Sequence, residues 1–564
     1  MKRGFRRLAA WILAAAVALT GCGGGRSGDA QGTPPQGDQA RSEAPTQPGG
    51  SKQVTIGIWS SPNTFNPISY DTTYTYLIIR MLYPTLLEMN DKLEFEGRLA
   101  EKWTVSDDKT KFTFYLNKNA RWTDGTPITA HDVAATVSMI ARPETKTTRR
   151  SLIDTIAGLD ENGTAPEGKV SGIRVVDDHT IEFTTKGPVD PDAFLEKLGV
   201  NVFIVPKVLL DQVQNPAEID REPWSMEPKV TGGPFKFVRY VTDQYVELEK
   251  NPDYWLGEPK LDKIFVRIVP RATIAAALEK GEIDMTGGAG IGEVPVEDWE
   301  KVAAMPHLTP ATYVAPSYQY LDVNAAQPHL SDPRVRRAFA HAINRQLIVD
   351  RLLKGQGEVL NTPLNSANKY YRPELQKELE YNPEKAKQLL QEAGWDFNRE
   401  IVLLTPTGNT VREQSADIIQ ANLQAVGVKV RVQKVDFPTR QAMAQRGEWE
   451  ISLVGFSATF DPDFSSQVSA KGAYNYRRLP GAENDNKKYY NPRLDELLLQ
   501  GKNTADFEER MRIYTEAQKV FIEDLPLIPL YAPKALVVVN KRVTGVKPGP
   551  QGLTWNTHEW DVTQ

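Results

Sequence analysis

The stretch from Leu99 to Met139, LAEKWTVSDDKTKFTFYLNKNARWTDGTPITAHDVAATVSM, carries the clearest structural pattern in the chain. The polar run from Ser106 to Lys109 predicts a turn, and the alternation of Phe112, Phe114 and Leu116 predicts a strand after it. Because successive side chains of a strand point to opposite faces, these three apolar residues would cover one face of a sheet. The turn would then join this strand to the preceding segment in a hairpin.

The second part of the stretch predicts a turn followed by a helix. The run Asp124-Gly125-Thr126-Pro127 has the composition of a turn, and Thr129 is a suitable N-cap for a helix that follows it. Asp132 lies at the third helical position, where its carboxylate completes a capping-box pattern with Thr129. Local physics alone therefore predicts a hairpin and then a capped helix.

The same stretch resembles the signature of the family 5 extracellular solute-binding proteins, the peptide and nickel receptors of ABC importers. Further strings similar to that family follow in the same order between about Gln53 and Val562. They are SPNTFNP at Ser61, TGGPFKFVRY at Thr231, NPDYW at Asn251, ALEKGEIDM at Ala277, YLDVNAA at Tyr320, DPRVRRAFAHAINR at Asp332, YNPEKAKQLLQEAGW at Tyr381 and FDPDF at Phe460. The resemblance implies a protein that binds and delivers solutes and catalyses no reaction.

The amino terminus has the features of a lipoprotein signal peptide at residues 1–21. Basic residues within the first seven positions precede an apolar run from Leu8 to Leu19, which is too short for a ~20-residue membrane span. The sequence Leu19-Thr20-Gly21-Cys22 resembles a lipobox and predicts lipidation of Cys22. An ordinary secretory signal with an incidental cysteine is the alternative. Cys22 is the only cysteine in the chain, so no intramolecular disulfide is possible.

The segment 22–50 is expected to be a flexible tether. It is dense in Gly, Pro, Gln and Ser and has almost no large apolar residue, so it cannot bury enough surface to offset the entropy of ordering. With a lipid on Cys22, it would hold the folded body at the outer face of the cytoplasmic membrane. The formal net charge of −5 and the lack of a long basic run argue against a nucleic-acid partner, and a monomer is expected.

About 510 residues of folded chain exceed what one hydrophobic core supports, so two or three domains are expected. The segment 384–435 reads helix, strand, helix, strand, which predicts a partly parallel α/β sheet. The resemblance implies a two-lobed clamp like the class II periplasmic binding proteins, with an extra domain. It places domain I at 51–96, 195–313 and 525–564, domain II at 97–194 and domain III at 314–524, with hinge crossings at 318–324 and 525–531.

Hydrophobic periodicity predicts further elements along the chain. Strands are expected at 54–59, 180–185, 246–248, 264–269, 401–405, 428–435, 451–456 and 535–539. Helices are expected at 76–87, 274–280, 333–354, 383–393, 412–426, 494–499 and 506–522. Pro333 and Pro383 are suited to the first position of a helix, and Gly394 and Gly427 to the position after its end.

The chain lacks the common catalytic and metal-binding motifs. HExxH and CxxC are absent and the six histidines are scattered, which predicts no metal site made by the protein alone and no cofactor. Ser106 and Lys109 match Ser-x-x-Lys, but they precede a strand instead of opening a buried helix. The glycines between Gly287 and Gly292 lack the Lys-Ser/Thr of a phosphate loop. A secreted hydrolase is therefore disfavoured.

Candidate ligand contacts lie where a two-lobed clamp would close. The run VGFSATFDPDFSS from Val454 places the end of an apolar strand just before Asp461-Pro462, where regular pairing must stop. An extended peptide can dock on the free backbone groups of such a strand end, although an ordinary core strand and turn is the alternative. The resemblance implies that this run, nearby aromatic residues and a facing loop line the cleft. The predicted contacts are Tyr70, Thr72, Thr73, Tyr74, Phe437, Phe456, Ser457, Ala458, Thr459, Phe460, Asp461, Tyr474 and Asn475.

One position departs from the pattern of the relatives. Dipeptide and many oligopeptide receptors resemble one another in holding an aspartate a few residues before this Asp-Pro turn, where it pairs with the α-ammonium of the ligand. Ala458 stands at that position here. A buried ammonium without a counter-charge is costly, so capture of an amine by that route is not expected. A polar insertion at 477–488 is expected to form an exposed flap of unknown role.

The sequence therefore predicts a lipid-anchored extracellular receptor that delivers a solute to the permease subunits of an ABC importer, with an oligopeptide as the favoured cargo. Closure of two lobes would be stabilised by contacts that exist only in the closed state. Receptors for a nickel chelate, an opine or a sugar are alternatives within the class. A signalling or adhesion lipoprotein on the same fold is a further alternative, which the sequence does not separate from transport.

Overall fold

The computed structural model describes residues 50–482 and 488–563. Residues from Gly50 onward form one compact unit. The predicted signal peptide, nearly all of the predicted tether, the lipidation site Cys22 and part of the 477–488 insertion lie outside the described residues. No helix in the described part of the chain is both long enough and apolar enough to cross a membrane.

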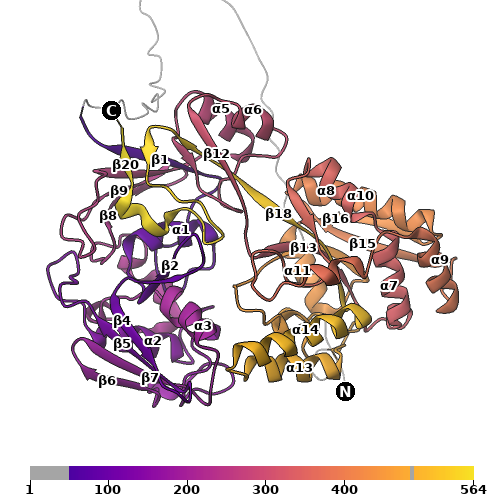
Figure 1. The fold of residues 1–564 in the computed structure, drawn as a ribbon, viewed down its shortest axis with the longest axis horizontal. Helices are drawn as coiled ribbons and strands as arrows, with labels where there is room; N and C mark the ends of the chain where they lie inside the picture. The colour runs from indigo at the N-terminus through magenta and orange to yellow at the C-terminus, as the bar shows by residue number, and fades with distance from the viewer. Residues whose placement is uncertain (1–49, 483–487, 564) are drawn as a thin grey trace, which may run out of the picture. The chain divides into compact units, whose positions relative to one another are not determined.

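A 12-stranded sheet runs through this unit (Figure 1). Its order is β16-β15-β17-β13-β18-β11-β1-β10-β9-β8, and β12 and β14 pair in addition with β18. The strands are β1 Gln53–Ile58, β8 Phe235–Val241, β9 Tyr245–Lys250, β10 Lys263–Ile268, β11 Met285–Thr286, β12 Leu308–Val314, β13 Ser317–Val323, β14 Gly357–Val359, β15 Glu400–Pro406, β16 Lys429–Val435, β17 Ile451–Ser457 and β18 Leu527–Asn540.

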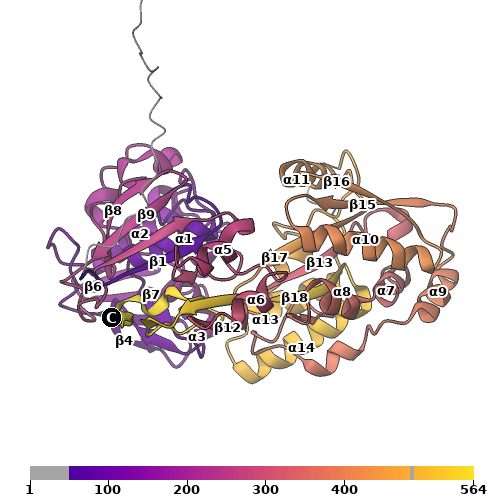
Figure 2. The same cartoon turned by 90° about the horizontal axis from the view of Figure 1, so that it is seen from above.

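Strand β18 joins the two sides of this sheet. Its first residues pair with β13, and its residues from Lys534 onward pair with β12. The apolar residues on either side gather in separate cores. We call residues 50–314 with 535–563 the first lobe and residues 317–532 the second lobe. The chain crosses between the lobes beside β12 and within β18, which Figure 2 shows bridging them.

The predicted hinge crossings at 318–324 and 525–531 are therefore misplaced by a few residues. Both segments lie inside the second lobe, because β13 and the start of β18 pair with each other there. The chain crosses between the lobes at 314–317, between β12 and β13, and at 532–535, where β18 stops pairing with β13 and starts pairing with β12.

The signature stretch folds as its sequence predicts. β4 Ala100–Val105 and β5 Lys111–Leu116 form an antiparallel hairpin, and the alternating apolar residues of β5 are buried. Helix α2, Ala130–Ala141, begins after Thr129, whose backbone N–H donates to Oδ2 of Asp132 over 2.8 Å. A four-stranded sheet of order β4-β5-β7-β6 packs against α2, with β6 at Ile173–Asp177 and β7 at Thr180–Thr184.

The predicted alternation of helix and strand in the second lobe is confirmed. β15 pairs in parallel with β16 and with β17, so this end of the sheet is the parallel part. Pro333 and Pro383 occupy the first turns of their helices. Gly394 and Gly427 follow helix ends with φ of +69° and +95°, a conformation that costs glycine no Cβ clash.

The segment 333–354 forms two helices instead of the single predicted one. They are α7 Pro333–Ala342 and α8 Arg345–Leu352. Ile343 between them is extended, with φ −84° and ψ +117°. The side chain of Asn344 then accepts a hydrogen bond from the backbone N–H three residues later, over 2.9 Å, and so caps a new helix.

Helix α1 also differs from the prediction, since it spans Thr73–Leu82 and not 76–87. It begins earlier because the hydroxyl of Thr72 accepts a hydrogen bond from the Thr75 N–H over 3.3 Å and caps the helix there. It ends earlier because Tyr83, the residue before Pro84, is extended, with φ −119° and ψ +141°, and Leu87 then belongs to β2, which pairs with β3.

The remaining elements complete a mixed α/β fold, as predicted. The other helices are α3 Pro191–Phe194, α4 Lys207–Leu210, α5 Ile274–Glu279, α6 Trp299–Ala303, α9 Pro383–Glu392, α10 Thr410–Ala425, α11 Phe437–Arg446, α12 Ser465–Val468, α13 Pro492–Lys502 and α14 Phe507–Asp524. The short strands are β2 Leu87–Met89, β3 Phe95–Gly97, β19 Val543–Thr544 and β20 Asp561–Val562.

Candidate functional site

The predicted contact segment starts at the end of β17. β17 pairs along its full length with β13 on one side, whereas on the other side β15 pairs with it only at Ile451 and Ser452. Beyond Ser452, no strand among residues 50–482 and 488–563 pairs with this edge. The backbone N–H of Ala458 still reaches across to the Pro316 carbonyl over 2.6 Å, so the strand end is held firmly on its β13 side.

Aromatic side chains flank this strand end. The ring of Phe456 meets the ring of Tyr474 edge to face, with centroids 5.5 Å apart and planes at 75°. Tyr474 is 52% exposed, and Phe437 in the first turn of α11 is 53% exposed. Ser457 and Thr459 are also exposed. The exposed parts of Phe437 and Tyr474 offer apolar contact surface that the core does not use.

Asn475 has a different role from its predicted neighbours. It is fully buried, and its Nδ2 donates to the carbonyls of Ser469 and Tyr489, each over 3.0 Å. Its Oδ1 accepts from the Arg477 backbone N–H over 3.2 Å. The amide is therefore occupied by the fold and holds the loop that carries Tyr474.

The predicted residues of the facing loop also divide into two kinds. Tyr70 is buried beneath the guanidinium of Arg149, which lies 4.1 Å from its ring centre, and burial raises the pKa of Tyr70 to about 12. Thr72 is the cap of α1. Thr73 is exposed and Tyr74 is half-buried, so only these two keep surface for a ligand.

The structure brings the last residues of the predicted segment against the first lobe. The Phe460 N–H donates to Oε1 of Glu196 over 2.9 Å, and the Phe460 side chain packs against the apolar core of the first lobe. Asp461 follows, buried, with Lys197 Nζ 3.7 Å from its Oδ2. Glu196 and Lys197 lie in a π-helical turn, Leu195–Val200, that continues α3.

Arg510 of α14 forms ion pairs with an aspartate of each lobe. Its Nη1 lies 3.2 Å from Asp190 Oδ2 in the first lobe, and its Nη2 lies 3.0 Å from Asp461 Oδ1 in the second. The hydroxyl of Tyr370 donates to Asp190 Oδ2 over 3.3 Å. Burial opposes ionisation of Asp461, but Lys197 and Arg510 outweigh it and hold the pKa of Asp461 below its usual value. Asp190, Tyr370, Asp461 and Arg510 are buried, and Lys197 is partly buried.

A cavity of about 360 Å³ lies between the lobes beside this network. The β2–β3 hairpin, α3 and the π-helical turn line it from the first lobe. Residues 366–370, the Phe460-Asp461-Pro462 turn and Arg510 line it from the second lobe. Its volume falls in the roughly 300–1,000 Å³ range of small-molecule sites.

Sequence reasoning missed the first-lobe wall of this cavity and, in the second lobe, Tyr370 and Arg510. Asp190, Glu196 and Lys197 were not among the predicted contacts. A signal for two of them exists, because Glu196 and Lys197 interrupt an otherwise apolar run, AFLEKLGVNVFIV from Ala193. Charged residues are rarely buried unless they are paired, so such an interruption marks either a surface or a buried polar contact.

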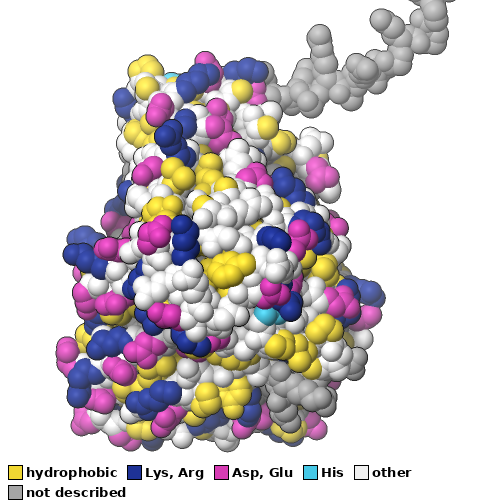
Figure 3. Space-filling view, turned by 90° about the vertical axis from the view of Figure 1, so that its right-hand side faces the viewer, with side chains coloured by type: hydrophobic (Ala, Val, Ile, Leu, Met, Phe, Trp, Pro, Cys, Tyr) yellow, Lys and Arg dark blue, Asp and Glu magenta, His cyan; other side chains and the backbone are white. Residues whose placement is uncertain are grey.

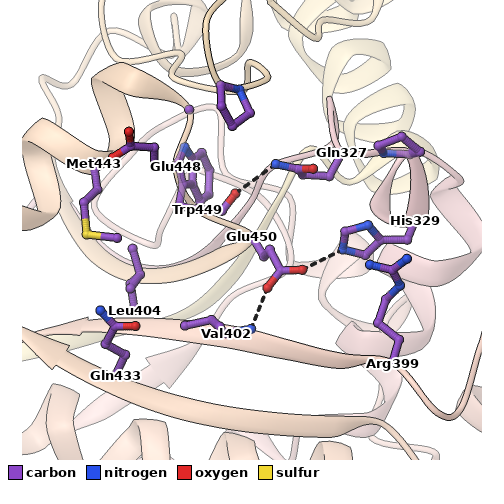
Figure 4. A pocket seen from close by; sticks show the side chains of 13 residues that line it. Gln327, His329, Arg399, Val402, Leu404, Gln433, Met443, Glu448, Trp449 and Glu450 are labelled. Atoms are coloured by element: carbon purple, nitrogen blue, oxygen red, sulfur yellow. Dashed lines mark hydrogen bonds and ion pairs between the residues drawn. The ribbon is translucent and has the colours of Figure 1, made fainter.

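A larger cavity, of about 770 Å³, lies within the second lobe and away from the predicted contacts (Figure 4). There Glu450 Oε1 lies 2.9 Å from His329 Nε2, and its Oε2 accepts the Val402 N–H over 2.8 Å. Both oxygens of Glu450 thus have partners from the protein, which gives the acid a structural use at the edge of the sheet.

Basic and acidic side chains are interspersed on the face of the second lobe that Figure 3 shows, without a field of one sign. Within residues 50–482 and 488–563, no group of three or more His, Cys, Asp and Glu side chains is arranged to hold a metal ion.

Comparison with known proteins places the chain in a family. The family model described as bacterial extracellular solute-binding proteins, family 5 (middle) matches residues 94–476. The chain belongs to family 5 of the bacterial extracellular solute-binding proteins. This family is not enzymatic, in agreement with the sequence prediction.

Relatives of this family 5 protein cover almost all of its length. The oligopeptide-binding protein AppA of Bacillus subtilis is 27% identical over 570 residues, 97% of each chain. The periplasmic oligopeptide-binding protein OppA of Salmonella typhimurium is 28% identical over 474 residues, 81% of each chain.

Solved structures share the fold of this family 5 protein. The ABC transporter substrate-binding protein CtaP of Listeria monocytogenes matches with a TM-score of 0.79 and 26% identity, over 91% of this chain and 100% of that one. AppA in complex with a nonapeptide matches with a TM-score of 0.75 and 26% identity, over 91% and 99%. The predicted fold class, a class II clamp with an extra domain, is confirmed by these matches.

Proposed function

We propose that this family 5 protein is the substrate-binding lipoprotein of an ABC importer, and that it captures an oligopeptide between its lobes and delivers it to the permease. Two relatives that match most of the chain are named for oligopeptides, and one was solved with a nonapeptide. The outer face of the cytoplasmic membrane is the proposed location, with Cys22 as the lipid anchor. The three-domain division that the family resemblance implies remains part of this proposal, with the start of the last segment of domain I moved from residue 525 to about residue 535.

The observation that carries the peptide proposal is the open edge of β17 from Leu453 to Ser457. A strand edge without a neighbour presents N–H and C=O groups that an extended peptide can pair with, and this needs no particular peptide sequence. Phe456 and Tyr474 lie at the end of that edge and supply apolar contact for side chains of the peptide.

The proposed contact set is smaller than the predicted one. It keeps Tyr74 and Thr73 on the first lobe, and Phe437, Tyr474 and the segment 456–460 on the second; Asp461 is left out because Arg510 and Lys197 occupy its carboxylate. Tyr70, Thr72 and Asn475 are left out, because each has its polar atoms or its ring engaged by the fold.

Closure of the lobes is the proposed mechanism of capture. The described chain passes between the lobes at two segments, 314–317 and 532–535. The contacts of Glu196, Asp190 and Lys197 with the second lobe exist only when the lobes meet. A ligand that adds contacts to both lobes would shift the protein toward this closed arrangement by its differential affinity for the two states.

The experiment is a binding measurement with backbone-modified peptides. Ligands that co-purify with the protein are first identified by mass spectrometry. The most abundant peptide is then synthesised in two forms, with N-methyl groups on its odd or its even residues, and calorimetry gives their affinities.

If the peptide pairs with a strand edge, only one set of its amides points at β17. A net hydrogen bond contributes ~0.5–1.5 kcal/mol, so losing two of them should weaken one form by about tenfold or more and spare the other. Equal affinity of both forms would contradict strand pairing, and co-purification of a metal chelate or a sugar would contradict the peptide proposal itself.

A further inference from the structure

Charge is balanced at every acid that lines the inter-lobe cavity except one. Asp190 and Asp461 share Arg510, at 3.2 and 3.0 Å, and Asp192 forms an ion pair with Lys369. Glu196 also lines the cavity, but it forms no ion pair with any lysine, arginine or histidine in the described part of the chain. It is the one acid of the cavity wall without a cationic partner there.

Glu196 is also deeply buried, with 5% of its surface exposed. Its side chain has a single hydrogen-bond partner among the described residues, the Phe460 N–H, which Oε1 accepts over 2.9 Å. Burial, and next the negative charge of Asp461, raise the pKa of Glu196 to about 7, although the Phe460 N–H, Lys197 and Lys369 act in the opposite direction. An isolated buried carboxylate is costly unless a cation or further hydrogen bonds reach it.

The surroundings of Glu196 fit a ligand that is cationic at one point and apolar elsewhere. Met89, Leu93 and Phe95 of the β2–β3 hairpin supply apolar walls on one side, and Pro462 supplies one on the other. Glu196 lies in a π-helical turn, a backbone form that occurs often at functional sites. Phe460, which lines the cavity, lies three residues after Ser457, the last residue of the strand with which the proposed peptide would pair.

We infer that Glu196 binds the ammonium group of the solute, and that the inter-lobe cavity holds the amino-terminal residue of a bound peptide. This inference rests on the proposed function. It assigns to a carboxylate of the first lobe the task that Ala458 cannot perform in the second. The same carboxylate touches Phe460 of the second lobe, so neutralising its charge with a ligand amine also removes a cost of bringing the lobes together.

A retention experiment tests this assignment. The probe is a synthetic nonapeptide library with randomised sequence, prepared with free and with acetylated amino termini. The full-length protein, the Glu196→Gln variant and a matched Glu161→Gln variant are each incubated with both forms at pH 7, and mass spectrometry quantifies the retained peptides. Glu161 is the control because its carboxylate also pairs across the lobes, with Lys471 at 2.8 Å, but is exposed.

We expect the wild type and Glu161→Gln to retain the free-amine library at least tenfold better than the acetylated one. In Glu196→Gln this ratio should fall close to one, because glutamine keeps the acceptor for the Phe460 N–H and loses only the charge. A wild type without preference for the free amine, or a Glu196→Gln variant that keeps the preference, would overturn the inference while leaving peptide binding intact. Retention of neither library by the wild type would overturn the proposed function and this inference with it.

Proton release gives an independent readout that a folding defect in the variant cannot imitate. At pH 6, a peptide α-amine is fully charged and a carboxyl with a pKa of about 7 is mostly protonated. Binding of an ammonium to Glu196 should therefore release about one proton, measured by calorimetry of the wild type in two buffers of different ionisation enthalpy. The acetylated library should release none.

The other acids around the cavity already have cationic partners, and lysines are among its remaining ionisable groups. Asp190, Asp192 and Asp461 are held by Arg510 and Lys369, and Lys197 lies beside Asp461. Lys92 also lines the cavity, but a lysine offers no carboxylate to a bound ammonium. Release that is equal for the free and acetylated libraries would assign the proton to one of these groups and overturn the inference.

Discussion

Replacing Asp190 by asparagine should loosen the contact between the lobes. Asp190 Oδ2 lies 3.2 Å from Nη1 of Arg510 and accepts the hydroxyl of Tyr370 over 3.3 Å, and both partners belong to the second lobe. Its Oδ1 accepts the Ala193 N–H over 3.0 Å and caps α3. Asparagine keeps an oxygen for this cap, so the substitution removes the charge that crosses between the lobes and spares the helix.

The magnitude follows from what Arg510 retains. Removing one partner of a buried ion pair costs ~3–5 kcal/mol when the other charge is left alone. Arg510 still has Asp461 at 3.0 Å and the Gly501 carbonyl at 3.1 Å, so its charge stays compensated. We therefore expect the loss of one hydrogen bond between charged groups, ~1.5–3 kcal/mol, which lowers the ratio of closed to open protein by about 10- to 150-fold.

The assay is a distance measurement between two nitroxide labels, at Lys169→Cys in the first lobe and Glu384→Cys in the second, in a Cys22→Ser background that has no other cysteine. Asp190→Asn should move population to longer distances in the ligand-free protein. Glu161→Gln, which removes an exposed pair across the lobes, should leave the distribution unchanged because solvent screens that pair. An unchanged distribution for Asp190→Asn would refute the idea that this buried pair holds the lobes together.

Three further predictions concern single residues. Burial raises the pKa of Glu196 from 4.5 to about 7, so the contribution of Glu196 to stability is greatest below pH 4.5, where the carboxyl is protonated, and is lost as the pH rises through 7. In thermal melting of the ligand-free protein, the free energy of unfolding of the wild type should therefore fall by about 3 kcal/mol over this window relative to that of Glu196→Gln. An equal pH dependence of the two proteins would contradict this. Asn344→Ala removes the cap of α8 and should cost about 1 kcal/mol in denaturant unfolding, whereas Asn344→Asp should cost much less. Cys22→Ser should leave a folded protein that is either released to the medium or kept as uncleaved precursor; a variant that stays membrane-bound at the processed mass in cell fractionation would argue against the lipid anchor.

Sequence patterns pointed to the end of β17 as part of the candidate site, but not to the residues that meet it, Glu196 of the first lobe and Arg510 of the second. The run before Asp461-Pro462 predicts a strand that ends before this turn, and β17 ends at Ser457. The contact of Phe460 with Glu196 joins residues 264 positions apart, and no local pattern encodes which strand end meets which helix turn. Asn475 was predicted as a ligand contact together with Tyr474, but its amide is buried, and its position in the sequence does not reveal this.

The sequence by itself determined the local elements of this protein. The capping box of Thr129 and Asp132, the helix-starting prolines and the left-handed glycines act between residues a few positions apart, so they can be predicted without knowledge of any tertiary contact. The tertiary structure decided where the lobes are joined, which residues between the lobes are free to contact a ligand, and which buried acid of the cavity lacks a cationic partner. Those properties depend on desolvation and on charges brought together from distant segments: burial, and next the charge of Asp461, raise the pKa of Glu196.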